Sequence, residues 1–198
     1  SKERIAHIRG HLLHQTSQEK TDPALQERHA RVIGKLKGFI DDPQLTLANT
    51  PADTVAHKIA RIVAEHRLSR SDEAIKHLNE LLAQEPKNPY FIELKGQILA
   101  ESGKEAEALP YYKQAMEATP QSGLLHTDYA RLLMAQEKPD YALAARELTR
   151  ASQLDSTNDR TWQLLGQAEA AIGHDGNAAL AHAEAALLQD DPELARRI

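Results

Sequence analysis

The chain has 198 residues, a net charge of −5, a hydrophobic fraction of 41% and an aromatic fraction of only 4%. This composition favours a core of closely packed helices rich in Ala and Leu over a β-sandwich. The acidic balance excludes the broad basic surface by which proteins bind nucleic acid or anionic membranes, and the lack of cysteine excludes disulfides and thiolate metal sites.

Residues 1–50 are predicted to form an N-terminal helical arm. The arm carries 8 Lys/Arg against 6 Asp/Glu (net +2), whereas residues 51–198 carry 16 against 23 (net −7). A short helix and a longer one, which begins near Asp22-Pro23, are separated by the polar residues 15–22. Their apolar faces are formed by Ile5, Ile8 and Leu12 and by Leu25, Val32, Leu36 and Phe39. We expect the arm to cap one end of the remaining chain.

The beginning of the chain contains no targeting signal. Ser1-Lys2-Glu3-Arg4 lacks Met, and no long apolar stretch follows it. The sequence therefore predicts neither a signal peptide nor a membrane span in these residues. We expect the chain to be a fragment of a longer precursor.

A repeat of about 34 residues is the main signal of the sequence. Pro86 and Pro120 lie 34 residues apart, and each follows an apolar helical run. The unit that Pro120 closes carries the tetratricopeptide pattern Ile92, Gly96, Leu99, Gly103, Ala108, Tyr112, Ala115 and Pro120. Gly96 and Ala115 are small where two helices cross closely, and Gly103 is expected to end the first helix in a left-handed conformation. The pattern predicts an all-α superhelix of helix-turn-helix units.

Residues 51–198 are predicted to hold four such units, at about 55–88, 89–122, 123–158 and 159–191. The first unit is degenerate, with Ser71 as the expected N-cap of its second helix. Pro110 lies within a predicted helix and is expected to produce a mild kink without breaking it.

No residues form a catalytic constellation. The sequence has no phosphate-binding glycine loop, nucleophile elbow or kinase signature. His7, His11 and His14 share one helical face, but no H-E-x-x-H arrangement accompanies them, so exposed histidines are the favoured interpretation over a metal site. We expect no catalytic residue, metal site or cofactor in this chain.

The first helices of the repeats supply candidate binding residues, because stacked hairpins leave a concave surface lined by these helices. Their inward positions are Tyr90, Glu93, Gln97, Glu101, Leu124, Thr127, Arg131, Met134, Arg160, Gln163 and Gln167, with Ile59, Val63, His66 and Arg67 in the degenerate unit. A protein or peptide partner is the expected ligand. The alternative is that the arm fills part of this surface.

Recognition of an acidic chaperone tail is not expected. Tetratricopeptide domains of that kind use Lys and Asn at set inward positions. The corresponding residues here include Ile59, Val63, Leu94 and Asp128.

Several longer strings resemble one known family along nearly the whole chain. They are Ser1-Lys2-Glu3-Arg4-Ile5, Asp22-Pro23-Ala24-Leu25-Gln26-Glu27-Arg28-His29, Lys35-Leu36-Lys37-Gly38-Phe39, Asn88-Pro89-Tyr90-Phe91-Ile92-Glu93-Leu94-Lys95-Gly96-Gln97 and Ala181-His182-Ala183-Glu184-Ala185-Ala186. In these strings the chain resembles the C-terminal tetratricopeptide region of bacterial HtpX/BepA-like zinc metallopeptidases.

The resemblance implies a non-catalytic module of a periplasmic enzyme that acts in outer-membrane protein quality control. The zinc and its H-E-x-x-H ligands would belong to a peptidase domain upstream of Ser1, and no catalytic residue carries over to this chain. The implied partners are that peptidase domain, substrate proteins and outer-membrane assembly machinery. A free-standing scaffold or assembly factor without a peptidase is the alternative.

Overall fold

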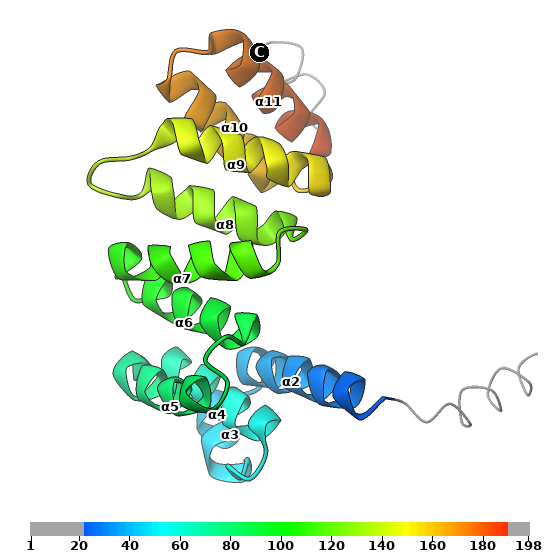
Figure 1. The fold of residues 1–198 in the computed structure, drawn as a ribbon, viewed down its shortest axis with the longest axis vertical. Helices are drawn as coiled ribbons and strands as arrows, with labels where there is room; N and C mark the ends of the chain where they lie inside the picture. The colour runs from blue at the N-terminus through cyan, green and yellow to red at the C-terminus, as the bar shows by residue number, and fades with distance from the viewer. Residues whose placement is uncertain (1–21, 190–198) are drawn as a thin grey trace, which may run out of the picture. The chain divides into compact units, whose positions relative to one another are not determined.

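The computed structural model describes residues 22–189, which contain ten α-helices and no strand (Figure 1). The all-α prediction is confirmed for these residues. The contacts divide the chain into two compact units, residues 1–68 and 69–198. The predicted division into an arm up to residue 50 and an array from residue 51 stays a prediction. No helix of residues 22–189 is both long enough and apolar enough to span a bilayer.

The first compact unit contains α2 (Pro23–Ile40), α3 (Pro43–Asn49) and α4 (Val55–Arg67). Helices α2 and α3 begin in the same way, with an Asp at the N-cap and a Pro at the first helical position. The Asp22 carboxylate accepts a hydrogen bond from the Ala24 amide at 3.0 Å, and the Asp42 carboxylate accepts one from Leu45 at 2.9 Å. Sequence analysis located α2 from this signal but missed α3, which carries the same one.

Helix α2 packs against α4 through two glycines, Gly34 and Gly38, which are buried. A Cβ atom at Gly34 would lie 2.3 Å from the carbonyl oxygen of Ala56, and one at Gly38 would lie 2.6 Å from the Cβ of Val63. These distances leave no room for a side chain. The two helix backbones therefore approach as closely as they do only because both positions are glycine.

Two arginines of α4 hold the carboxyl ends of the neighbouring helices. The Arg61 guanidinium donates to the carbonyls of Leu47 at 2.6 Å and Thr50 at 2.9 Å, at the end of α3. Arg67 donates to the carbonyl of Gly38 at 2.8 Å and to that of Asp41, at the end of α2. A cation is favourable there because the last carbonyls of a helix lack intrahelical donors.

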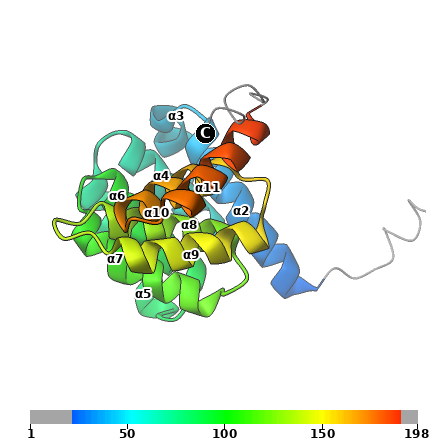
Figure 2. The same ribbon diagram turned by 90° about the horizontal axis from the view of Figure 1, so that it is seen from above.

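The second compact unit contains α5 (Ser71–Gln84) followed by three helical hairpins that stack in chain order (Figures 1 and 2). The hairpins are α6 (Pro89–Glu101) with α7 (Glu105–Ala118), α8 (Gly123–Met134) with α9 (Tyr141–Leu154), and α10 (Asp159–Ala171) with α11 (Asp175–Leu188). Each hairpin lies within one predicted repeat. The predicted repeat at 55–88 instead has α4 in the first unit and α5 in the second.

Small residues act as the repeat pattern predicts. A Cβ at Gly96 would lie 2.9 Å from the Tyr112 ring, and Ala115 is fully buried. Gly103 and Gly173 have φ of 73° and 81°, in the left-handed region. The prediction for Ser71 is wrong, because Arg70 occupies the N-cap position of α5 and its side chain makes no capping hydrogen bond. Helix α7 continues unbroken through Pro110, as expected.

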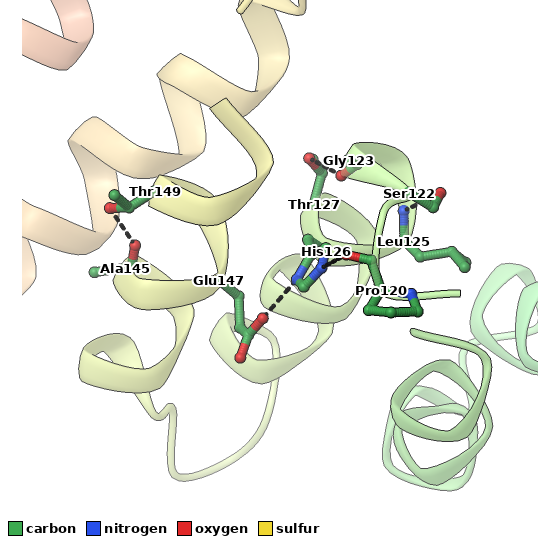
Figure 3. A network of polar contacts seen from close by, with 9 residues as sticks. All are labelled: Pro120, Ser122, Gly123, Leu125, His126, Thr127, Ala145, Glu147 and Thr149. Atoms are coloured by element: carbon green, nitrogen blue, oxygen red, sulfur yellow. Dashed lines mark hydrogen bonds and ion pairs between the residues drawn. The ribbon is translucent and has the colours of Figure 1, made fainter. Parts of the chain in front are cut away.

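A buried histidine joins the middle hairpin to the turn before it (Figure 3). The Nδ1 atom of His126 lies 2.7 Å from the Glu147 carboxylate of α9, and its Nε2 atom lies 3.2 Å from the carbonyl of Pro120. Both ring nitrogens thus face oxygen atoms that accept hydrogen bonds. This contact fixes α8 relative to α9 and to the α7–α8 turn.

Candidate protein-binding surface

Most of the predicted binding residues on α6, α8 and α10 are accessible. Glu101, Leu124, Arg160 and Gln167 are exposed, and Tyr90, Glu93, Gln97, Arg131, Met134 and Gln163 are half-buried. Part of the Met134 side chain packs against the core of the second unit. Ten of the eleven predicted positions can therefore offer surface to a partner.

Thr127 is the exception, with only 1% of its surface exposed. Its hydroxyl donates to the carbonyl of Gly123 at 3.0 Å (Figure 3). The same hydroxyl lies 2.8 Å from the hydroxyl of Thr161. Thr161 lies 34 residues later, on α10, and is also buried. Thr127 thus links two successive hairpins and is not available to a ligand.

Charged residues of three successive hairpins meet around Asp128 of α8. Burial raises the pKa of the Asp128 carboxyl, Arg131 and Arg160 act to lower it, and Glu93 and Glu101 raise it further. The carboxylate of Asp128 lies 3.8 Å from Nε of Arg131. Helices α6, α8 and α10 therefore present their charges to one another on a common face.

Tyr112 of α7 lies beneath this charged face. Burial raises the pKa of its phenol well above the ordinary value, and Asp128 is the next largest cause of the increase.

On α6 the Gln97 side-chain amide donates to the Glu101 carboxylate at 2.8 Å. We call the surface formed by Glu93, Gln97, Glu101, Asp128, Arg131 and Arg160 the inner face.

The repeat pattern predicts an inward position for Asp128 but gives no sign that its carboxylate is partly buried. Its spacing of three residues before Arg131 is the local signal that the two side chains share a helix face. Burial by neighbouring hairpins depends on tertiary packing, which the spacing does not contain.

Of the inward positions predicted on α4, two are buried, whereas His66 is half-buried and Arg67 is exposed. Ile59 and Val63 are 0% and 1% exposed, and Val63 lies against Gly38 of α2. Helix α2 of the predicted arm therefore packs on α4, and the alternative in which the arm fills part of the concave surface stays a prediction. Arg67 points to the carboxyl end of α2, as described above, and is not a ligand-binding side chain.

The expectation that the chain holds no metal or cofactor stays a prediction. His7, His11 and His14 lie outside the described residues. Within residues 22–189 no three His, Asp or Glu side chains gather in a way that could hold a metal ion.

The amino-terminal part of the chain is similar in sequence to a known domain family. The sequence pattern of the bacterial transcriptional activator domain (BTAD) matches residues 13–122, which is more than half of the chain. The chain belongs to the BTAD family. The BTAD match includes the sequence of α2 to α7 and ends at the turn before α8. None of the curated proteins compared with the chain matches it.

Solved structures of MamA share the fold. "MamA MSR-1 C2" has a TM-score of 0.64 and 15% identity, covering 84% of this chain and 98% of its own. "MamA RS-1 ArsTM double mutant" has a TM-score of 0.66 and 17% identity over 83% and 94%. "MamA AMB-1 P212121" has a TM-score of 0.64 and 16% identity over 84% and 93%. At these identities the likeness shows the fold alone, a tetratricopeptide-type helical repeat, which confirms the predicted fold class.

Proposed function

We propose that the chain is a non-catalytic protein-interaction module whose inner face binds an extended segment of a partner protein. The observation that supports this proposal is that charged side chains from three successive hairpins surround the partly buried carboxyl group of Asp128. Burial of a carboxylate opposes its ionisation. A residue that breaks a packing rule in this way is typical of a functional surface.

The charges of the inner face indicate the chemistry of its partner. Three carboxylates, Glu93, Glu101 and Asp128, are opposed by two guanidinium groups, Arg131 and Arg160. A segment with basic residues near the carboxylates and an acidic residue near Arg160 is complementary to both signs. Such complementarity selects a partner and its register more than it adds raw affinity.

For the larger protein we propose a periplasmic zinc metallopeptidase of the HtpX/BepA-like type, in which this module positions substrates for quality control. The resemblance of the Asn88–Gln97 string and of the other strings given above supports this proposal. Zinc and its ligands would then belong to a separate peptidase domain. The partners would be that domain, substrate proteins and outer-membrane assembly machinery.

A second candidate is favoured by the family match at residues 13–122. In that case the module would serve a bacterial transcriptional activator. A free-standing scaffold is the remaining alternative. The coding sequence upstream of Ser1 distinguishes them: a signal peptide with H-E-x-x-H supports the peptidase, a DNA-binding domain supports the activator, and an immediate start codon supports the scaffold.

Photo-crosslinking in cells tests the inner face. With a photoreactive phenylalanine analogue in place of Tyr90, the chain should trap a partner, and Arg131→Glu with Arg160→Glu should reduce trapping about tenfold, equivalent to roughly 1.4 kcal/mol. Arg146→Glu, at an exposed position of α9, is the matched control and should leave trapping unchanged. Equal trapping in both variants would place the binding site elsewhere.

A further inference from the structure

Helix α2 has two opposite faces of different character. Gly34 and Gly38 form the face that packs against α4. On the opposite side, alternating intervals of four and three residues separate Leu25, His29, Val32, Leu36 and Phe39, which is the spacing of an interhelical seam. The face predicted from sequence to be the packing face of the arm is thus the one that points away from α4.

Large apolar side chains remain exposed on this side. We call the surface formed by Leu25, Val32, Ile33, Leu36 and Ile40 the α2 outer face; their exposed fractions are 56%, 47%, 39%, 47% and 75%. Single exposed apolar residues are ordinary in folded proteins, whereas a contiguous stripe marks an interaction surface.

The amino-terminal half of α2 has no packing of its own, since every residue from Asp22 to Ala30 is exposed. A helical segment of this length is marginal in water without tertiary packing. The carboxyl-terminal half is held by Gly34, Gly38 and the hydrogen bonds from Arg67. The part of the outer face on this half, from Val32 to Ile40, is therefore presented on a fixed helix, which reduces the entropy that a partner must remove on binding.

The charge of α2 restricts what can cover its outer face. The helix carries Arg28, Arg31, Lys35 and Lys37 but only one acidic residue, Glu27. At 100° per residue, the exposed Arg28 and Lys37 flank the apolar stripe on its two sides. A helix with acidic flanks would form ion pairs with both.

Two other occupants are less compatible with this charge. A second copy would bring the basic helix against itself, and like charges at facing positions oppose association. The amino-terminal residues 1–14 carry Lys2, Arg4 and Arg9 against Glu3 alone, so they too are basic.

We propose that the α2 outer face binds an amphipathic helix of a partner protein that carries Asp and Glu on either side of its own apolar stripe. This is a helix-to-helix contact with anchors at intervals of three and four residues. It is independent of the inner face, because its residues belong to the first compact unit.

The test uses the full chain and two designed helical peptides as long as α2. Both peptides carry Leu at the seam positions, one with Glu and the other with Lys on the flanks. Fluorescence anisotropy should show the Glu peptide binding at least about tenfold more tightly than the Lys peptide. Reversal of the flanking charges by Arg28→Glu with Lys37→Glu should invert this preference.

Leu36→Asp should weaken binding of the Glu peptide about tenfold or more. Leu180→Asp, at a leucine of α11 that is 61% exposed, is the matched control and should leave binding unchanged. Both positions are exposed, so circular dichroism should show the same helix content in the two variants.

The proposal is overturned if neither peptide binds, if both bind equally, or if Leu180→Asp weakens binding as much as Leu36→Asp does. Sedimentation showing a dimer that Leu36→Asp dissociates would identify a second copy as the occupant.

Discussion

Ser69 has the backbone conformation that glycine has at equivalent positions of the repeat. Its φ is 60°, against 73° for Gly103, which lies 34 residues later, and 81° for Gly173. A side chain in the left-handed region costs about 1–2 kcal/mol because Cβ crowds the following carbonyl oxygen. Ser69→Gly should therefore stabilise the chain by about 1 kcal/mol and raise Tm by about 2–4 °C.

Thermal unfolding followed by circular dichroism checks this, with Ser69→Ala as the matched control. Alanine keeps the Cβ atom and so retains the strain. An equal gain from Ser69→Ala would show that the conformation of Ser69 is not the cause.

Asp128 makes stability depend on pH in a defined direction. Burial raises the pKa of its carboxyl above the ordinary 3.8, so the folded state binds this proton more tightly than the unfolded state does. The contribution of Asp128 to the free energy of unfolding therefore falls as pH rises from 3.8 to the higher pKa that this carboxyl has in the folded state. Above that pKa the contribution stays low. Asp128→Asn does not ionise and should gain stability relative to the wild type as pH rises from acid to neutral.

Urea unfolding of both proteins across this pH range measures the difference. Because Asn also loses the ion pair with Arg131, the sign of the pH dependence is the decisive quantity. A stability difference that stays constant with pH would contradict the assignment.

Residue-scale prediction from sequence succeeded where the backbone itself imposes the residue type. Gly103 was identifiable because the left-handed turn between two helices selects glycine, and Gly173 has the same conformation two hairpins later in the array. Thr127 was placed on the right helix but wrongly interpreted as accessible. Its burial depends on Thr161 of the next hairpin, a contact that one helix register does not specify.

At the scale of elements, adding even a methyl group to Gly34 should disrupt the contact between α2 and α4. A methyl group at Gly34 would lie 2.3 Å from the Ala56 carbonyl oxygen, which belongs to the backbone and cannot rotate away. Gly34→Ala should lower the free energy of unfolding by about 1–3 kcal/mol, as overpacking does.

Gly176→Ala is the matched control, because a Cβ at Gly176 meets no atom within 4 Å. It should be neutral or slightly stabilising, since Ala is a better helix former than Gly. Urea unfolding measures both, and a Gly34→Ala chain as stable as the wild type would exclude the close α2–α4 contact.

The same contact explains why the packing of α2 was harder to predict than its position. Asp22-Pro23 gave the start of the helix, and hydrophobic periodicity gave a face containing Leu25, Val32 and Leu36. Periodicity assumes that the apolar face is the buried one. Gly34 and Gly38 carry no apolar signal, although they permit the closest approach.

At the scale of the whole molecule, the second compact unit is organised in one dimension. Each of its helices packs mainly on its neighbours in the chain, and α8 also contacts α10. Small residues at the period of about 34 identified this arrangement from sequence, because stacking requires them in each hairpin. The partner of an exposed surface could not be found in this way, since it depends on atoms of another molecule.

One-dimensional packing predicts that a local defect stays local. Leu165 of α10 is 7% exposed and belongs to the core, so Leu165→Ala should remove about 2–5 kcal/mol of packing energy from the last hairpin. In an array with nearest-neighbour coupling, the amides of α10 and α11 should exchange faster with deuterium while those of α6 and α7 keep their protection. Hydrogen exchange followed by mass spectrometry resolves these segments.

Leu180→Ala, at the exposed position on α11, is the control and should leave the exchange rates of all these helices unchanged. Equal acceleration from α6 to α11 in Leu165→Ala would mean that the hairpins unfold as a single cooperative unit.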